Sequence, residues 1–485
     1  MANAAETIHR IQPPGWMIQP QMRAIMAALM ADGLPARFVG GCVRDAILGL
    51  APADIDIATP AAPERVQKLL KRAGIKAIPT GIDHGTVTAV LPPVQCEITT
   101  LRRDIDTDGR HAVVQFGTDW AEDAARRDFT INALYGDGDG GIFDPTGQGL
   151  EDLRAGRVRF IGDAEQRVRE DYLRALRFFR FHARFASGAP DAAALAACRS
   201  AVPGMARLSA ERVSAELIKL MALPKAAPAL AAMQECGLLA ALLPEARLDL
   251  PALERLIALQ QQLGGAELAD PEDPWPRFSL LLGEGWEAAA DRLKLSNAQR
   301  KRLEDLAQPL DWAAFADPEG RAALYYDHGA PICRDRALLA ATRDSGGAGT
   351  GRTADSGPDQ GPGQGADLGP DRGPDRGADR GLAAGPGQGA ELAARAAALP
   401  GLLETMRDWR KPVFPLRGAD LLAHGLRHGP GLGGMLKELE AWWRQDGCRA
   451  DREACLAHLR QRVVIEESEL PLPKEAKAEA KPPKA

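Results

Sequence analysis

A short segment near the N-terminus places two carboxylates, an arginine and a glycine pair close together. Gly40 and Gly41 close an apolar run, Arg44 follows, and Asp54 and Asp56 stand two positions apart in the alternating run ADIDIA. Alternate residues of a strand project from the same face, so we expect the two aspartates to lie side by side. Two carboxylates that close repel each other unless a cation lies between them, and Mg²⁺ is the hard, oxygen-seeking ion that fits best.

The glycine pair and Arg44 point to a phosphate ligand. Glycines let backbone N–H groups approach a phosphate without a Cβ in the way. A DxD pair alone is more often a solvated strand edge or a turn, but this one has the glycines and Arg44 just before it. The combination predicts chemistry on a nucleoside triphosphate.

A third acidic residue, Glu97, lies in the strand-like run VQCEITTLRRD between apolar neighbours. It either keeps a strand edge soluble or faces inward as a partner of Asp54 and Asp56. Metal-assisted phosphoryl transfer needs a group that activates the attacking hydroxyl, so we favour the inward, catalytic interpretation.

The residue pattern changes once along the 485-residue chain, which is long enough for two or three domains. Short β-type runs at 36–40, 55–58, 85–91 and 96–101 give way after about residue 150 to Leu, Ala and Arg at helical spacing. We therefore predict an α+β head, a small mixed sheet with helices, followed by an all-α neck, body and tail. The predicted segments are a catalytic head at 18–150, a neck at 151–245, a body at 246–343, and a tail at 390–465.

Two segments have a different composition. Residues 344–389 are rich in Gly, Pro, Asp and Arg, and residues 466–485 mix Lys, Glu, Pro and Ala. Neither can bury much apolar surface, so both are predicted to be disordered. Between them, Trp442 and Trp443 follow a helical pattern and are predicted to pack in a core rather than to stack on bases.

Composition limits the cellular setting. The net charge of −6 does not exclude RNA binding, because basic residues can cluster. The chain lacks an apolar run of about 18 residues, so we predict no membrane span. Seven scattered cysteines without a CxxC pattern are typical of reduced thiols, and a cytoplasmic location is expected.

The sequence RRDFTIN contains Arg126, Arg127, Asp128 and Asn132. One interpretation is a charged helix start with Asp128 as its cap. The other is a grip on a nucleotide, in which the arginines give forked donors to phosphate oxygens and Asn132 reaches a sugar hydroxyl.

The sequence EDYLRALRFFRF contains Asp171, Arg174, Arg177 and Arg180 at a spacing of three on a predicted helix. Ordinary salt bridging on a solvated helix face explains this spacing, at about 0.2–0.5 kcal/mol per pair. The same helix could instead present Asp171 and Arg174 to the edge of a base and Arg177 and Arg180 to phosphates.

Together these motifs resemble the class II tRNA nucleotidyltransferase and poly(A) polymerase family. The motifs GG-x-VRD, DxD, RRDFTINA and EDxxRxxRFxxRF occur in the family's order and separation, within about residues 35–245. That stretch includes DPTGQGLEDL and LSAERVSAELIKLM, and a weaker similarity returns at 416–436.

The resemblance implies a role for each matched position. It implies metal binding by Asp54 and Asp56, triphosphate contacts at Gly41 and Arg44, and nucleotide contacts at Arg126, Arg127 and Asn132. It also implies that Asp171 and Arg174 read the base. Arg177 and Arg180 are implied as two further nucleotide-binding positions. Gly40 and Asp128 stand inside the same motifs and are counted as nucleotide-binding candidates.

The implied activity is template-independent, Mg²⁺-dependent addition of CCA to the 3′ end of tRNA from CTP and ATP. A poly(A) polymerase or an enzyme that adds only part of CCA remains the alternative within the family. A non-catalytic RNA-binding protein is a third hypothesis, but such a protein would be free to lose Asp54, Asp56 and Arg127, and all three are present.

Overall fold

The computed structural model describes residues 7–107, 112–343 and 388–469. The chain forms two compact units, described separately below: Met1–Gln261 with Pro271–Ala307, and Gln262–Asp270 with Gln308–Ala485. The boundary after Ala307 falls inside the predicted body, where helix α16 (Asn297–Ala307) ends just before Pro309. The predicted disordered segments lie outside the described residues, except that α20 already begins at Gln388 and α23 continues to Glu469.

The first unit contains an eight-stranded mixed sheet in the order β1-β10-β9-β2-β3-β6-β5-β4. Only β3 and β6 run parallel, while the other neighbours are antiparallel. The four predicted strand runs are confirmed as β2, β3, β5 and β6. The strand bounds are β1 His9–Arg10, β2 Arg37–Val39, β3 Asp56–Thr59, β4 Lys76–Gly81, β5 Thr86–Leu91, β6 Val94–Thr100, β9 Tyr135–Gly136 and β10 Gly141–Phe143.

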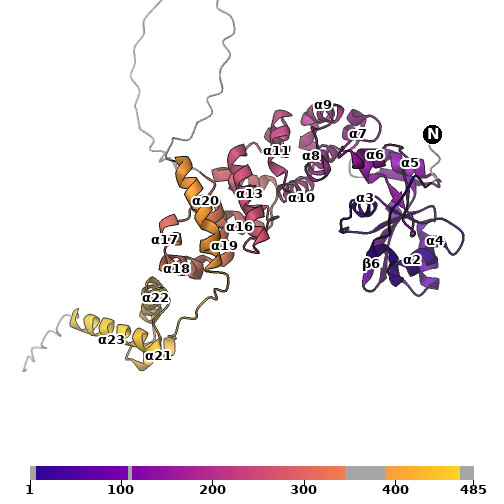
Figure 1. Cartoon of the computed structure of the whole chain (residues 1–485). Coiled ribbons are helices and arrows are strands. Elements are labelled where there is room, and N and C mark those ends of the chain that lie inside the picture. Colours follow the sequence, from indigo (N-terminus) through magenta and orange to yellow (C-terminus); the bar gives the residue numbers. More distant parts are fainter. Residues whose placement is uncertain (1–6, 108–111, 344–387, 470–485) are drawn as a thin grey trace, which may run out of the picture. The chain divides into compact units, whose positions relative to one another are not determined.

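One face of this sheet is covered by helices and carries the core. Helices α2 (Pro20–Met30) and α4 (Pro63–Arg72) pack against each other and against β5, and α4 also contacts β6 (Figure 1). In β6, Cys96 and Ile98 are buried while Glu97 between them is exposed. The alternation of a strand therefore places Glu97 on the face opposite Cys96 and Ile98.

A separate two-stranded sheet extends from this domain. It pairs β7 (Arg102–Thr107) with β8 (Ala112–Phe116) in antiparallel fashion. The ring of Phe116 lies against Gly85, where an added Cβ would come within 2.7 Å of the ring. Gly85 has a φ of +82°, so both its backbone conformation and this close contact favour glycine.

Helices complete the first unit and confirm the predicted change from mixed to all-α structure. An aromatic cluster joins the end of the sheet domain to the first long helix, α8: Phe129 contacts the rings of Phe160, Phe178 and Phe181. The bounds are α1 Gly15–Ile18, α3 Gly41–Ile47, α5 Trp120–Ala125, α6 Gly149–Arg154, α7 Ala164–Glu170, α8 Leu173–Phe185, α9 Ala192–Ser200, α10 Ala210–Met221, α11 Ala226–Glu235, α12 Leu238–Leu242, α13 Leu250–Gly265, α14 Trp275–Leu282 and α15 Trp286–Arg292, with short 3₁₀ turns η1 Ile82–His84, η2 Thr130–Asn132, η3 Val202–Arg207 and η4 Gly283–Gly285.

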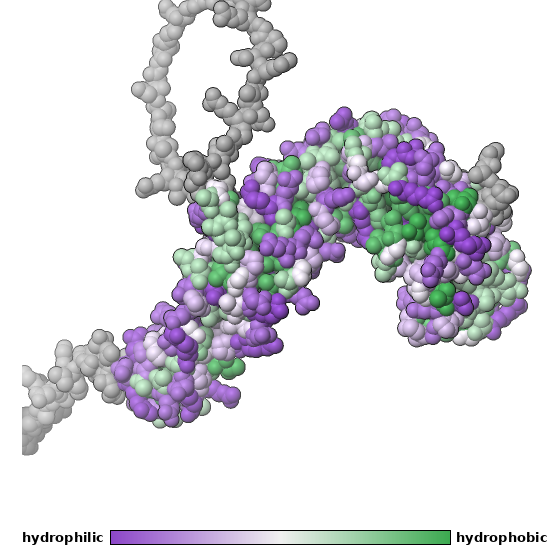
Figure 2. All heavy atoms as spheres, viewed as in Figure 1, coloured by the Kyte–Doolittle hydropathy of each residue, from purple (hydrophilic) through white to green (hydrophobic). Residues whose placement is uncertain are grey.

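The described part of the second unit is helical. Its core includes Tyr326, Leu439, Trp443 and Leu459, and its viewed surface is mostly hydrophilic (Figure 2). Among the described residues, no helix is both long and apolar enough to cross a membrane. The bounds are α17 Trp312–Ala316, α18 Pro318–His328, α19 Ala330–Ala340, α20 Gln388–Glu404, α21 Gly418–Ala423, α22 Pro430–Gln445 and α23 Arg452–Glu469.

The two adjacent tryptophans of α22 have different surroundings. Trp443 is 2% exposed, donates its indole N–H to the Ala450 carbonyl at 2.8 Å, and meets Tyr326 edge to face. Trp442 is only partly buried and stacks on His458, with ring centroids 4.1 Å apart. The predicted core packing is confirmed for Trp443.

We predict that Trp443→Ala lowers the free energy of unfolding of the second unit by about 3–5 kcal/mol, because it opens a cavity in the core. Trp442→Ala, on the same helix, is the matched control and should lower the free energy of unfolding by clearly less. Denaturant unfolding followed by circular dichroism measures both. Equal losses from the two substitutions would contradict the assignment of the core.

Candidate active site

Two carboxylates face the same side of the sheet at the start of β3, and a third, Asp54, comes two residues before Asp56 in the chain. Asp56 is the first residue of that strand and pairs directly with Glu97 of the parallel strand β6. Since paired residues of neighbouring strands share a face, Asp56 and Glu97 project to the same side of the sheet. Asp54 lies in a bend before the strand, so the expectation that both aspartates stand within one strand is wrong. Asp54 is exposed, whereas Asp56 is half-buried.

The charge on this group is not balanced by the protein. Burial and the negative charge of Glu97 raise the pKa of Asp56 to about 6, Asp54 adds to the rise, and only Arg127 opposes it. A divalent cation would relieve this repulsion, so the donor set fits a hard metal ion. Within the described ranges, no group of three or more His, Cys, Asp or Glu residues is arranged to hold a metal ion. A bound triphosphate would supply the missing oxygens.

The glycine pair shapes the turn from β2 into α3. Gly40 has a φ of +76°, and a Cβ there would lie 3.4 Å from Nη1 of Arg127. The Gly40 amide already donates to the Leu134 carbonyl at 3.0 Å. Gly40 therefore serves the turn and the close approach of Arg127, and its own N–H is not available to a phosphate. Phosphate contact by Gly41 stays a prediction.

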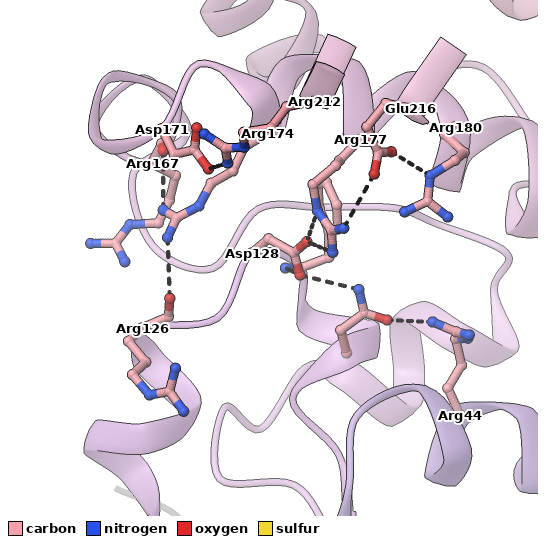
Figure 3. A network of polar contacts seen from close by, with 12 residues as sticks. Arg44, Arg126, Asp128, Arg167, Asp171, Arg174, Arg177, Arg180, Arg212 and Glu216 are labelled. Atoms are coloured by element: carbon pink, nitrogen blue, oxygen red, sulfur yellow. Dashed lines mark hydrogen bonds and ion pairs between the residues drawn. The ribbon is translucent and has the colours of Figure 1, made fainter. Parts of the chain in front are cut away.

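A chain of polar side chains runs from α3 to α8 (Figure 3). Arg44 donates to Oδ1 of Asn132 at 2.5 Å, and Nδ2 of Asn132 donates to Oδ1 of Asp128 at 3.1 Å. The other oxygen of Asp128 accepts from Nε and Nη2 of Arg177 at 2.8 and 2.6 Å. The predicted candidates Arg44, Asn132, Asp128 and Arg177 are thus brought into one network.

Burial makes this network strong. By itself burial would raise the pKa of Asp128, but the charge of Arg177 and the hydrogen bond from Asn132 lower it below its usual range. Arg44 is 6% exposed, pairs with Asp45 at 2.7 Å, and stacks over the ring of Phe185 at 4.1 Å. Each charged group here therefore has a partner, as buried charges require.

Glu216 of α10 extends the network. Its carboxylate lies 2.6 Å from Nε of Arg180 and 3.7 Å from Nη1 of Arg177. Four residues earlier on the same helix, Arg212 pairs with Asp171 at 2.6 Å (Figure 3). One face of α10 therefore holds three members of the predicted nucleotide-reading segment, Asp171, Arg177 and Arg180.

The predicted base-reading pair is arranged differently from expectation. Asp171 lies in extended backbone at the C-terminal end of α7, before the N-cap residue Tyr172 of α8, so it is not part of α8. Its carboxylate accepts from the Leu173 amide at 3.1 Å. Arg174 is in α8 and pairs with Glu170 at 2.6 Å. Asp171 and Arg174 thus have separate partners in this structure.

The two arginines of RRDFTIN share one carboxylate. Asp123 accepts from Nη2 of Arg126 at 2.7 Å, from Nη2 of Arg127 at 3.0 Å, and from the hydroxyl of Tyr135 at 2.6 Å. Asp128, the third residue of the motif, is not a helix N-cap, because it lies between α5 and η2 and the N-cap of η2 is Phe129.

Sequence reasoning missed Asp123, Arg212 and Glu216. Asp123 precedes Arg126 by three residues and Arg127 by four. On a helix these are the spacings at which opposite charges pair, so the sequence contained a signal for this contact. Arg212 and Glu216 stand four apart inside LSAERVSAELIKLM, but nothing local shows that their partners lie on α8 or beside it.

Comparisons with known proteins identify the family of the chain. Residues 36–159 match the family described as "Poly A polymerase head domain", and residues 189–249 match "Probable RNA and SrmB- binding site of polymerase A". The chain is 32% identical over 442 residues to the mitochondrial CCA tRNA nucleotidyltransferase 1 of Mus musculus, which covers 88% of this chain and 86% of the relative. It is 40% identical over 305 residues to the CCA-adding enzyme of Geobacillus kaustophilus, covering 60% of this chain and 72% of that enzyme.

Solved structures lead to the same family. The crystal structure of the Bacillus stearothermophilus CCA-adding enzyme in complex with CTP aligns with a TM-score of 0.59 and 26% sequence identity. The alignment covers 93% of this chain and 100% of that one. The similarity therefore extends through both the mixed sheet and the helical part.

We predict that Asp128→Asn lowers the free energy of unfolding of the first unit by about 1.5–3 kcal/mol, because it removes the charged acceptor of Arg177 and leaves the Glu216 carboxylate, 3.7 Å away, as the remaining ion-pair partner. Asp291→Asn is the control: it breaks an ion pair with Arg300 whose aspartate is 75% exposed, and should cost less than about 1 kcal/mol. Urea unfolding of both variants measures the difference. Similar small losses would show that the network does not hold α8.

Proposed function

Because the chain belongs to the class II family of CCA-adding enzymes and poly(A) polymerases, we propose that it adds CCA to the 3′ end of tRNA from CTP and ATP. Support comes from relatives named for this activity and from the CTP complex of an aligned structure. The observation that carries the proposal is the carboxylate group, in which Asp56 and Glu97 face the same side of adjacent parallel strands with Asp54 beside them.

We propose that Asp54 and Asp56 hold Mg²⁺. When bound, the ion would neutralise charge on the triphosphate and favour ionisation of the RNA hydroxyl. In the transfer, the 3′-hydroxyl oxygen forms a bond to the α-phosphorus while the bond from that phosphorus to the bridging oxygen breaks, and pyrophosphate leaves. Glu97 lies beside Asp56 and is our candidate for holding the hydroxyl proton as it departs.

We propose that Arg126 and Arg127 bind the triphosphate and that Asn132 binds the ribose. Base choice is assigned to Asp171 and Arg174, since a carboxylate and a guanidinium together can pair with the edge of cytosine or adenine. In this structure Asp171 pairs with Arg212, and Arg174 pairs with Glu170. A base would therefore exchange with existing ion pairs, and the net gain is the difference between the two sets of contacts.

The helical remainder is proposed to position tRNA. Residues 189–249 match a family described as a probable RNA-binding site, and the resemblance at 416–436 lies in the second unit. Recognition would use phosphate contacts and shape, so affinity should fall as salt rises. The segment division into neck, body and tail remains part of this proposal.

We also propose a cytoplasmic location. All seven cysteines are free thiols, as expected in a reducing compartment. The mouse relative is named as mitochondrial, so fractionation of source cells decides between the two locations.

The function is tested by incubating the protein with Mg²⁺ and each labelled NTP, on a tRNA that lacks CCA and on an unstructured RNA. Addition of two C residues and one A to the tRNA alone supports the proposal. Long A tails on either RNA would indicate a poly(A) polymerase, and addition of only C or only A would indicate a partial enzyme.

We predict that Asp56→Asn reduces nucleotide incorporation about 100-fold or more, because it removes charge from the metal-binding pair. Asp32→Asn, an aspartate of the same unit that pairs with Arg65, is the control and should retain activity. Incorporation of labelled CTP on tRNA measures both. A folded Asp56→Asn protein with near wild-type activity would contradict the site.

We predict that Arg174→Ala reduces the preference for CTP and ATP over UTP and GTP by about 10- to 100-fold, since a donor to the base edge is lost. The control is Arg169→Ala, an arginine of α7 that is 67% exposed and pairs with Glu165. Competition between labelled NTPs on tRNA measures selection. If selection is unchanged while the rate falls, Arg174 binds phosphate or supports the fold only.

A further inference from the structure

Asp123 is a buried carboxylate without a role in the chemistry proposed above. It lies on α5, its side chain is 1% exposed, and it pairs with both Arg126 and Arg127. The Tyr135 hydroxyl donates to the same oxygen that Arg127 contacts. Three donor side chains, two of them from consecutive residues, therefore converge on one carboxylate.

We infer that Asp123, assisted by Tyr135, is a positioning residue that sets the direction of the Arg127 guanidinium toward the triphosphate. This inference rests on the proposed function, because it assumes that a nucleotide lies beside Gly40 and Asp56. It adds a residue that acts through Arg127 and does not touch the nucleotide itself.

The guanidinium of Arg127 is held on one side only. Nη2 is fixed by Asp123, and the guanidinium lies 5.6 Å from the centre of the Tyr135 ring. Nη1 faces Gly40, only 3.4 Å from the position of an added Cβ. Nε is buried and has no hydrogen-bond partner among the described residues. The Nη1 side of the Arg127 guanidinium thus points to the glycine turn. The positive charge of Arg127 lowers the pKa of Asp56, against the rise caused by burial and Glu97.

Charge balance supports an anionic ligand at that edge. Burial alone would raise the pKa of Asp123, but Arg127 and Arg126 outweigh it and bring the pKa to about 2, so the carboxylate stays ionised. One carboxylate faces two guanidinium groups. The group of three therefore keeps about one positive charge, which a triphosphate oxygen would neutralise.

A purely structural role would give different results, and the chain offers a matched comparison. Asp152 is fully buried, pairs with Arg157 and Arg159, and accepts from Thr130 at 2.7 Å. It resembles Asp123 in burial and in holding two arginines, but it has no contact with Arg127. Loss of stability alone should therefore affect both aspartates alike.

The test is a double-mutant cycle with Asp123→Asn and Arg127→Ala, read as KM for CTP on tRNA without CCA and for ATP on tRNA ending in CC. We expect each single variant to raise both KM values about tenfold or more, with the choice of CTP over UTP unchanged. The effect of the double variant should be clearly smaller than the sum of the two single effects, since Asp123 acts mainly through Arg127 and only the part exerted through Arg126 remains. Asp152→Asn combined with Arg127→Ala should instead give additive effects.

Additive effects of Asp123→Asn and Arg127→Ala would overturn the inference. If Asp123→Asn does not fold, as judged by circular dichroism, Tyr135→Phe serves in its place, because it removes only the hydroxyl donor. It should raise both KM values in the same direction and by less, again only when Arg127 is present. The same cycle can be measured as the Kd for CTP, which requires no turnover. A wild-type protein that binds CTP but transfers no nucleotide would contradict the proposed function, and the Kd cycle would still test the role of Asp123.

Discussion

The structure of the first unit depends on the ion pair between Asp128 and Arg177. Asp128 belongs to the sheet domain, just before η2, whereas Arg177 belongs to α8. A buried carboxylate without its guanidinium would be costly, so the pair favours one arrangement of these elements over others. Through Asn132 the same carboxylate reaches Arg44, and through Glu216 the arginine reaches Arg180. Five residues implied in nucleotide binding therefore share one polar framework: Arg44, Asp128, Asn132, Arg177 and Arg180.

Charge is separated within the site. The acidic side, around Asp56 and Glu97, lacks enough positive charge, whereas the basic side, around Arg126 and Arg127, has more positive charge than Asp123 balances. A metal-bound triphosphate complements both sides, since it brings a cation to the first and phosphate oxygens to the second. The arrangement thus accounts for the substrate class without reference to the base.

Sequence patterns predicted what is local and missed what depends on tertiary contacts. The alternating runs around Asp56 and Glu97 identified both strands, but only the sheet shows that the two residues are direct partners. The spacing of three in EDYLRALRFFRF suggested one helix, yet Asp171 lies outside it, in extended backbone between α7 and α8, where its carboxylate accepts from the Leu173 amide. Glu216 could not be assigned from its own helix, since its partners on α8 are more than thirty residues away.

The central claim is that this framework holds a nucleotide between the carboxylates and α8. A crystal structure of the chain with CTP and Mg²⁺ tests it most directly. The account predicts the triphosphate between Asp56 and Arg127, and the cytosine edge against Asp171 and Arg174, with at least one of the present ion pairs to Arg212 and Glu170 released. A base bound elsewhere, with both ion pairs intact, would contradict the account.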